Sequence, residues 1–423
     1  MCGLDQGVGF LMRDGLDPRF VVMGADLTGA YILAGHSAPA SYHIGGTGVI
    51  VDEALIRTFG ETTERYAQVI SADPGRHRMV RATWAEMVAA GRAVVPEERL
   101  RFFSPEQHAA PGFPFQPFDA GATLTWICVS SLLGEPEVWA PAQLVLVGYG
   151  PRREAGEPWL MAAVSTGTAA HTVPTLAVRN AILELVQIDA AMGHWYSGAS
   201  APAIELDERC RRLTRVVERT FPSGQPHPVF HRLASADLPG HVVACVIEQP
   251  PGKLPSIGVG LGIDLRLERA LYRSLLEAVG VIQLAKVTLL NRATNGGAGE
   301  IDPGGIFDLD SNVAYYAQAP RRPQLRENFP TDEWLPASDL PPDHILVDPA
   351  AEVQLLLDAF SEAGLSLVGL DLTTPDIREL GFVAHRVWSP DILPLALPSA
   401  PPTRHQRFAA YGGAAHVAPH PYP

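Results

Sequence analysis

The pattern of apolar and polar positions along the chain predicts both helices and strands. Apolar residues recur at helical spacing in three long stretches, at residues 52–70, 175–195 and 265–286, and each stretch follows a turn. Short apolar, β-branched runs bounded by Gly, Pro or acidic residues predict buried strands. These runs are QLVLVGYG (143–150), WLMAAVSTG (159–167), HVVACVIEQ (241–249) and LSLVGLDL (365–372). The sequence therefore predicts a mixed α+β protein.

Other segments lack periodicity. Residues 104–121 and 321–343 are dense in Pro, Phe, Asp and Glu, which predicts long loops or connections between lobes. From Pro390 onward proline recurs too often for a helix or a central strand, and the stretch AAYGGAAHV (409–417) is expected to be flexible. We expect a short N-terminal segment, a main domain and a Pro-rich tail, with these bounds: 1–43, 44–390 and 391–423.

The composition of the chain disfavours several classes of protein. The chain carries 32 Lys and Arg against 46 Asp and Glu, a formal charge of −14, which disfavours nucleic acid as a partner. Its four cysteines form no C-x-x-C pair, so they predict neither a zinc knuckle nor a dithiol redox motif and fit a reducing cytoplasm. The first residues lack the basic end and apolar core of a secretory signal, and no stretch reads as a membrane span. A soluble cytoplasmic protein without membrane contact is expected.

The three predicted helices share glutamates in apolar surroundings. Glu61 and Glu64 stand three residues apart, so both carboxylates project from one helical face and could bind one cation or two neighbouring cations. Glu184 and Glu277 lie within the apolar runs AILELV and SLLEAVG, where an unpaired carboxylate is costly to bury. Two interpretations remain open: a shared metal-binding cage, or ordinary amphipathic helices whose glutamates face water.

Glycine-rich stretches precede two of these helices. GGTG begins with Gly45 and Gly46, and STGTAA begins with Ser165, Thr166 and Gly167. Small residues before a helix allow backbone N–H groups to approach a phosphate, although a tight turn is the simpler interpretation.

Other motifs carry less information. GVGLG (258–262) imitates a dinucleotide fingerprint with its third glycine one residue early, so we expect the end of a strand rather than an NAD site. The histidines show no H-E-x-x-H spacing, and no G-x-S-x-G is present. Neither an imidazole metal site nor a serine hydrolase is predicted.

From about residue 43 to the end, the chain resembles the YcaO family. The resemblance rests on four stretches that occur in the order found in that family. They are GGTGVIVDEALIRTFGETTERYAQ, STGTAAHTVPTLAVRNAILELVQIDAAMGHW, GLGIDLRLERALYRSLLEAVGVIQ and LDLTTPDIRELGFVAHRVWSPDILPL. The resemblance implies a YcaO fold with mixed sheets and packed helices in several lobes around a nucleotide cleft.

It also implies an activity. YcaO enzymes use ATP and Mg²⁺ to phosphorylate a backbone amide oxygen, and the best-known members convert Cys, Ser or Thr of a precursor peptide to azolines. The resemblance makes Glu61, Glu64, Glu184 and Glu277 metal ligands. Cyclodehydratases of the family end in alternating prolines, as PHPYP does here, and a stiff proline rod could place the carboxylate of Pro423 in a cleft as general base.

The chain also departs from the family pattern. Where E-x-x-E-R-D is usual, it has Gln187 and Ile188, and where E-x-x-Q-x-R is usual, it has Gly280 and Ile282. A metal ligand and two phosphate-binding charges are missing, for which Arg179, Arg269 and Arg273 are substitutes by sequence. Three alternatives stay open: a working cyclodehydratase, a degenerate scaffold or substrate-binding partner of an active copy, and an enzyme that forms a thioamide or amidine.

The resemblance finally implies partners. Only some 43 residues precede GGTG, so we expect a separate E1-like protein that binds the leader of the precursor peptide. A homodimer is expected from the family. Oxidation of the rings would need a separate flavin-dependent dehydrogenase.

Overall fold

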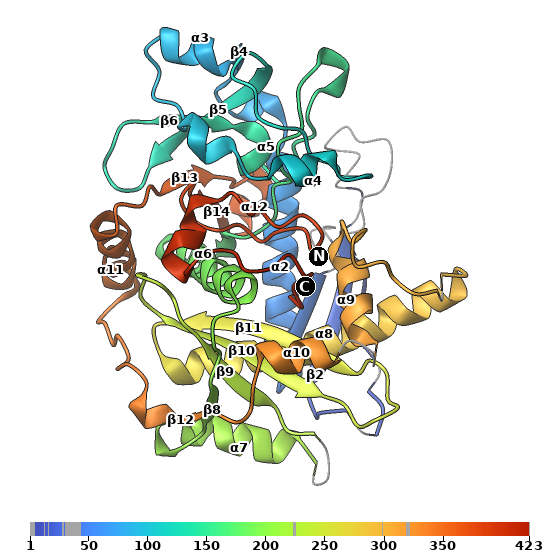
Figure 1. The fold of residues 1–423 in the computed structure, drawn as a ribbon. Helices are drawn as coiled ribbons and strands as arrows, with labels where there is room; N and C mark the ends of the chain where they lie inside the picture. The colour runs from blue at the N-terminus through green and yellow to red at the C-terminus, as the bar shows by residue number, and fades with distance from the viewer. Residues whose placement is uncertain are drawn as a thin grey trace.

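Three sheets and the long helices between them organise the chain (Figure 1). The computed structural model describes residues 5–422 except 12, 16, 28, 30–43, 223–225, 298 and 319–321. Figure 1 shows the six-stranded sheet in the upper part of the view and the five-stranded sheet in the lower part, with α2 and α6 between them. The expected α+β class is confirmed.

The first sheet is antiparallel, in the order β1-β2-β3, and the other two mix strands from distant parts of the chain. The first contains β1 (Asp5–Phe10), β2 (Val21–Leu27) and β3 (Ile44–Gly48). The five-stranded sheet has the order β11 (Ile257–Asp264), β10 (His241–Glu248), β9 (Val229–Leu233), β8 (Ala203–Glu205) and β12 (Trp334–Pro336). The six-stranded sheet has the order β4 (Met79–Thr83), β5 (Thr123–Ser131), β13 (Val368–Asp371), β14 (Val383–Trp388) and β7 (Thr168–His171), with β6 (Val138–Pro141) beside β5.

Three helices are much longer than the rest, and they coincide with the three predicted ones. These are α2 (Val51–Ser71), α6 (Pro174–Ser197) and α8 (Leu267–Thr294). The shorter helices are α3 (Trp84–Ala89), α4 (Pro105–Ala109), α5 (Ala142–Val145), α7 (Arg211–Thr220), α9 (Leu309–Ala317), α10 (Arg322–Asn328), α11 (Pro349–Glu362) and α12 (Pro375–Glu379). A 3₁₀ turn, η7 (Gln406–Tyr411), lies near the end of the chain.

Glycines in β11 let α8 pack directly on the strand backbone. A Cβ atom on Gly260 would stand 2.1 Å from the backbone nitrogen of Ala278 in α8, a distance that no side chain tolerates. GVGLG therefore lies inside β11 rather than at a strand end, and the expectation of a strand end is wrong. Glycine is required on this face of β11 because α8, the helix that carries Glu277, packs against it.

The same kind of packing places α2 on β3. A Cβ atom on Gly46 would stand 2.2 Å from the carbonyl oxygen of Ala54. The expected domain boundary after residue 43 falls just before β3, which pairs with β2 across it. Residues on both sides of that boundary therefore share one sheet.

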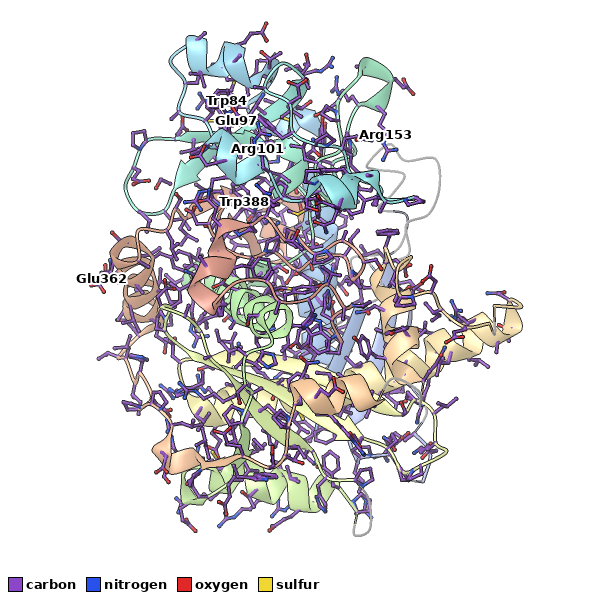
Figure 2. The ribbon with its side chains drawn as sticks, viewed as in Figure 1. Trp84, Glu97, Arg101, Arg153, Glu362 and Trp388 are labelled. Atoms are coloured by element: carbon purple, nitrogen blue, oxygen red, sulfur yellow. The ribbon has the colours of Figure 1, made fainter. Side chains whose placement is uncertain are left out.

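The helix α6 runs through the largest apolar core. Between Ala181 and Tyr196 every residue is buried except Glu184 and Gln187. Side chains fill the space around this helix, and labelled residues such as Trp84, Arg153 and Glu362 lie toward the outside of the molecule (Figure 2).

Two predicted strands are confirmed and two are wrong. Residues 241–249 and 365–372 contain β10 and β13. Residues 143–150 begin in α5, and residues 159–167 form no strand. In residues 159–167 the backbone N–H groups bond to side-chain amide oxygens instead of to a neighbouring strand. The N–H of Leu160 donates to Gln143 at 2.7 Å, and the N–H of Trp159 donates to Gln116 at 2.6 Å.

The segments without periodicity are more ordered than expected. Residues 104–121 include α4, and residues 321–343 include α10 and β12. The tail is packed into the protein: Leu393, Phe408 and Tyr422 are buried. Residues 409–417 are also tied down, because the N–H of Ala415 donates to the carbonyl of Tyr196 at 2.7 Å.

By length and composition, α8 alone among the described helices could cross a membrane. This is weak evidence, since 56% of its most apolar window is buried within the protein. Its packing on β11 is typical of a core helix.

Candidate functional site

The three long helices bring their glutamates together. Negative charge on Glu184 of α6 helps raise the pKa of both Glu64 of α2 and Glu277 of α8, so these carboxylates are close enough to repel one another. Glu61 acts on the other three glutamates in the same way. The four predicted metal ligands therefore form one cluster.

On α6 and α8 the glutamates of the cluster lie on partly exposed strips. On α6 the accessible residues Glu184 and Gln187 are three positions apart and share a face. On α8, Arg273, Glu277 and Gly280 form a similar partly exposed strip. Only 18% of the Glu64 side chain is exposed. The glutamates therefore lie on helix faces that solvent or a ligand can reach.

Two glycine N–H groups orient two of the carboxylates. The N–H of Gly45 donates to Glu61 at 3.0 Å, and the N–H of Gly167 donates to Glu184 at 3.1 Å. Gly167 has φ +84°, and a Cβ atom there would stand 2.3 Å from the carbonyl oxygen of Val387. The glycines predicted to approach phosphate therefore hold metal-ligand candidates in this structure.

The other predicted phosphate-binding residues lie beside them. Gly46 is buried against α2. The carbonyl groups of Ser165 and Thr166 accept hydrogen bonds from the guanidinium of Arg386, at 3.0 Å for Ser165. The 165–167 turn is thus fixed from both sides, by Arg386 and by Glu184.

Two arginines that the sequence reasoning missed belong to the site. Arg65 pairs with Glu61 at 3.3 Å and with Glu64 at 3.7 Å, and its place directly after Glu64 was the signal available in the sequence. Arg386 of β14 is buried, and its charge acts on Glu64 and Glu184. Nothing local in the sequence links Arg386 to the glutamates, because it stands more than a hundred residues after Glu277, the last of them.

Burial disfavours the charged form of three of these carboxyl groups. Burial raises the pKa of Glu184 to about 7 and that of Glu277 to about 8, and it raises the pKa of Glu64 well above its usual value. Burial also lowers the pKa of Arg386 to about 10. Neighbouring carboxylates add to the shifts of the glutamates. Such a cluster favours a bound cation.

The donor set fits Mg²⁺ together with a phosphate ligand. Carboxylate oxygens are preferred Mg²⁺ ligands, and the ion usually takes only one or two from the protein, with substrate phosphates and water completing its shell. Among the residues that the structure describes, no group of three or more His, Cys, Asp or Glu is arranged as a metal site. A Mg²⁺ ion here would therefore need phosphate and water as further ligands.

Two cavities lie elsewhere in the molecule. One, of about 280 Å³, is between α8 and α9 and is lined by Arg292 and Asp310, and the other, of about 230 Å³, lies beside β9 and β10 near Arg232. None of the four glutamates lines either cavity. Both cavities are therefore separate from the carboxylates.

A comparison with family models assigns the chain to a family. A model described as YcaO cyclodehydratase, ATP- and Mg²⁺-binding, matches residues 45–393. The chain belongs to the YcaO family. The expected cofactors, ATP and Mg²⁺, are confirmed at the level of the family. A comparison with curated protein sequences finds no match.

Solved structures share the YcaO fold. A heterocyclase in complex with substrate and cofactor is 20% identical, with a TM-score of 0.71 over 92% of this chain and 50% of that chain. YcaO from Methanopyrus kandleri, bound with AMPPCP and Mg²⁺, is 20% identical, with a TM-score of 0.57 over 91% of this chain and 86% of that one. The E. coli microcin synthetase McbBCD complex matches at 12% identity and TM-score 0.61, over 98% and 96%. The chain spans half the length of the heterocyclase, and at these identities the likeness concerns the fold.

The two isoleucines that replace arginines of the YcaO pattern are both buried. Ile282 is 1% exposed and lies against Gly258 of β11, where an added Cβ would stand 2.5 Å from its side chain. Ile188 is 6% exposed in the core around α6. Neither position is open to a ligand in this chain, so neither could present a charge to phosphate without repacking.

The three substitute arginines differ in availability. Arg179 is buried and forms ion pairs with Asp264 and Glu352, so its charge is neutralised within the protein. Arg273 is 37% exposed and lies 3.6 Å from Asp264. Burial lowers its pKa, and the nearby positive charges of Arg57 and Arg269 lower it further. Arg273, on the same strip as Glu277, is therefore better placed to meet an anion than Arg179.

The tail runs into the interior near α6. The indole of Trp195 donates to the carbonyl of Ala418 at 2.9 Å, and the amide of Asn312 donates to those of His420 and Tyr422 at 2.7 and 3.0 Å. Tyr422 is fully buried. Pro423, the predicted general base, lies outside the described residues.

Proposed function

We propose that this YcaO protein is an ATP-dependent cyclodehydratase that converts Cys, Ser or Thr of a ribosomal precursor peptide to azolines. One observation supports this most: Glu61, Glu64, Glu184 and Glu277 converge from three helices, with Arg65 and Arg386 beside them. A scaffold that bound only peptide would have no need of such a costly arrangement of buried charge.

The reaction forms a bond between the side-chain sulfur or oxygen and the preceding amide carbon. Bound ATP supplies the phosphoryl group with which the amide oxygen departs as phosphate, and the side chain and the amide nitrogen each lose a proton. In this proposal Glu61 and Glu184, oriented by Gly45 and Gly167, hold Mg²⁺ together with Glu64 and Glu277. Arg65 and Arg386 offset the remaining negative charge.

Binding of ATP tests this function first. Calorimetric titration of the protein with ATP in the presence of MgCl₂ should give saturable binding, and replacement of Glu184 by Gln should abolish it. The matched control is Glu362→Gln, an exposed glutamate on α11. Lack of binding at millimolar ATP, with the E1-like partner present, would favour a degenerate scaffold instead.

Product analysis separates the remaining alternatives. Incubation with a Cys- and Ser-rich precursor peptide, the partner and ATP should remove one water from the peptide for each ring. A product that exchanges amide oxygen for sulfur would identify a thioamide-forming enzyme.

The proposal includes Pro423 as the general base. The docking of residues 418–422 supports it, because a fixed tail can hold a terminal carboxylate in one place. A chain that carries one Gly after Pro423 should bind ATP normally and form rings more slowly by roughly 100-fold or more. Ring formation at the unmodified rate would exclude this role.

Partners and location belong to the proposal as well. We propose a cytoplasmic homodimer that acts with an E1-like protein, and a separate flavin-dependent dehydrogenase where rings are oxidised. Size-exclusion chromatography with light scattering, on the protein alone and with the partner, tests the two assemblies.

A further inference from the structure

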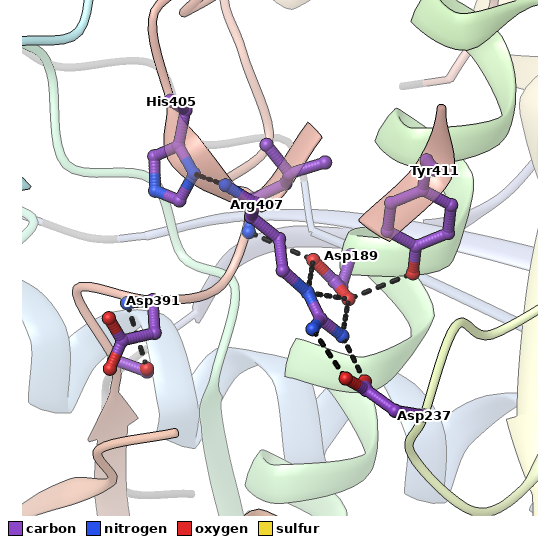
Figure 3. A network of polar contacts seen from close by, with 8 residues as sticks. Asp189, Asp237, Asp391, His405, Arg407 and Tyr411 are labelled. Atoms are coloured by element: carbon purple, nitrogen blue, oxygen red, sulfur yellow. Dashed lines mark hydrogen bonds and ion pairs between the residues drawn. The ribbon is translucent and has the colours of Figure 1, made fainter. Parts of the chain in front are cut away.

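A buried ion pair joins the tail to the helix that carries Glu184. The guanidinium of Arg407 in η7 donates to both carboxylate oxygens of Asp189 in α6 (Figure 3). Its Nε lies 3.2 Å from Oδ1 and 2.9 Å from Oδ2, and its Nη2 lies 2.7 Å from Oδ2. The same guanidinium donates to Asp237 at 2.9 Å. The Asp189 side chain is fully buried and that of Arg407 is 4% exposed, whereas that of Asp237 is 39% exposed. We call these residues, with Tyr411, the tail clamp.

Tyr411 completes the clamp on the same face of α6. Its hydroxyl donates to Asp189 at 2.8 Å. Its ring covers Gly193, one turn further along α6, where an added Cβ would stand 2.5 Å from the ring. The N–H of Leu393 also donates to Asp189 at 3.0 Å. Asp189 therefore gathers two separate parts of the tail.

The tail stays beside α6 after the clamp. Beyond Tyr411, the N–H of Ala415 donates to the carbonyl of Tyr196, and the carbonyl of Ala418 accepts from the indole of Trp195. Both partners lie in the last turn of α6. The clamp therefore stands where residues 412–422 begin their course along the end of this helix.

We propose that the tail clamp is a positioning device, in which Arg407 and Asp189 fix the tail to α6 so that turnover depends on a pair that touches no substrate. The inference rests on the proposed function. Asp189 lies five residues after Glu184 on one helix, so the clamp ties the position of the tail to that of a metal-ligand candidate. A buried charge whose partner is removed is strongly destabilising, which gives the clamp a single favoured arrangement.

The test uses the full chain and removes both charges of the buried pair at once. Asp189→Asn with Arg407→Gln leaves no uncompensated buried charge, and Asp237 is exposed enough to be solvated. The double variant should fold and bind ATP with an unchanged Kd. Chymotrypsin should cleave it after Tyr411 at least tenfold faster than the wild type, and turnover should fall about 100-fold at an unchanged KM for the peptide. The single variant Arg407→Lys, which keeps the charge, should restore part of the turnover.

A matched control separates the clamp from ordinary ion pairs. Glu248→Gln with Arg326→Gln removes an exposed pair with a distance of 2.8 Å that lies away from the tail, and it should change neither cleavage nor turnover. Cleavage of the clamp variant at the wild-type rate would overturn the proposal, and so would faster cleavage with wild-type turnover. A wild-type protein that shows no turnover would count against the proposed function, and the cleavage rates would then decide on the clamp alone.

Discussion

The hydroxyl oxygen of Thr47 in β3 lies 3.0 Å from the point where a Cβ atom on Gly280 of α8 would stand. Thr47 is 8% exposed, so it has little room to yield. The YcaO pattern has glutamine at position 280. This chain has glycine there, and the close approach of β3 gives a physical reason.

Restoring the glutamine should therefore destabilise the protein through Thr47. Gly280→Gln should lower the free energy of unfolding by about 1–3 kcal/mol because it overpacks this contact. Combination with Thr47→Ala should recover most of the loss, which chemical denaturation of the four proteins of the double-mutant cycle measures. Additive effects of the two substitutions would show that Thr47 does not set the available space.

The raised pKa of Glu277 predicts a stability that falls with pH when no divalent cation is present. Its pKa is raised from 4.5 to about 8 on folding, so the folded state holds a proton that the unfolded state releases between these values. Stability from this group is present below pH 4.5 and is lost as the pH rises toward 8. Glu277→Gln should raise the Tm at pH 8 by about 2 °C or more, with little change at pH 5, in buffer containing a chelator.

Glu362→Gln is the control for this prediction, since that side chain is exposed on α11 and should leave both melting temperatures unchanged. Equal effects of Glu277→Gln at the two pH values would contradict the buried, protonated carboxyl.

His420 predicts the opposite dependence at acid pH. Burial lowers its pKa from 6.5 to about 4, and both ring nitrogens are used: Nε2 lies 2.7 Å from the carbonyl oxygen of Ala396, and Nδ1 accepts from the N–H of Tyr422 at 3.2 Å. Because the unfolded state takes up a proton first, stability from this group is present above pH 6.5 and is lost as the pH falls toward 4.

Each pKa unit between the two states corresponds to about 1.4 kcal/mol, so the effect of His420 should be measurable. His420→Gln should lower the Tm at pH 7.5 and should make the decline between pH 7.5 and 5 shallower. His227→Gln, at an exposed position, should leave the slope as it is. An unchanged slope in His420→Gln would exclude a neutral buried imidazole.

Two substitutions of Tyr422 distinguish the contribution of its buried ring from that of its hydroxyl group. Its side chain is fully buried, and its hydroxyl has no hydrogen-bond partner. Tyr422→Ala should cost about 3–5 kcal/mol of unfolding free energy, as large-to-small substitutions in cores do. Tyr422→Phe should be neutral or stabilising, because it removes only the unsatisfied hydroxyl. Equal losses in the two variants, measured by denaturation, would place an unrecognised partner on the hydroxyl.

The sequence was sufficient for the three long helices and for the glutamates on them, because helical periodicity and isolated carboxylates are local signals. It was not sufficient for Arg386, which reaches the cluster only through the pairing of β14 with β7. The segment 143–150 has the composition of a strand, yet the hydrogen bonds of Gln143 give it another structure. Competition of this kind depends on tertiary contacts that no window of sequence contains.

The order of the tail could not be predicted from local sequence either. Its prolines and glycines favour a flexible segment, and the aromatic and polar partners that bury it, Trp195 and Asn312, are supplied by helices far away in the sequence. Only the pairing of these partners explains why residues 418–422 are ordered.

The burial of residues 418–422 also has a consequence for synthesis in the cell. Trp195 and Tyr196 leave the ribosome more than two hundred residues before the segment that covers them, so a nascent chain cannot close its largest core until translation has passed residue 422. During that interval the aromatic face of α6 is exposed to chaperones and to neighbouring nascent chains. Closure of this core should therefore wait until residue 422 has left the ribosome.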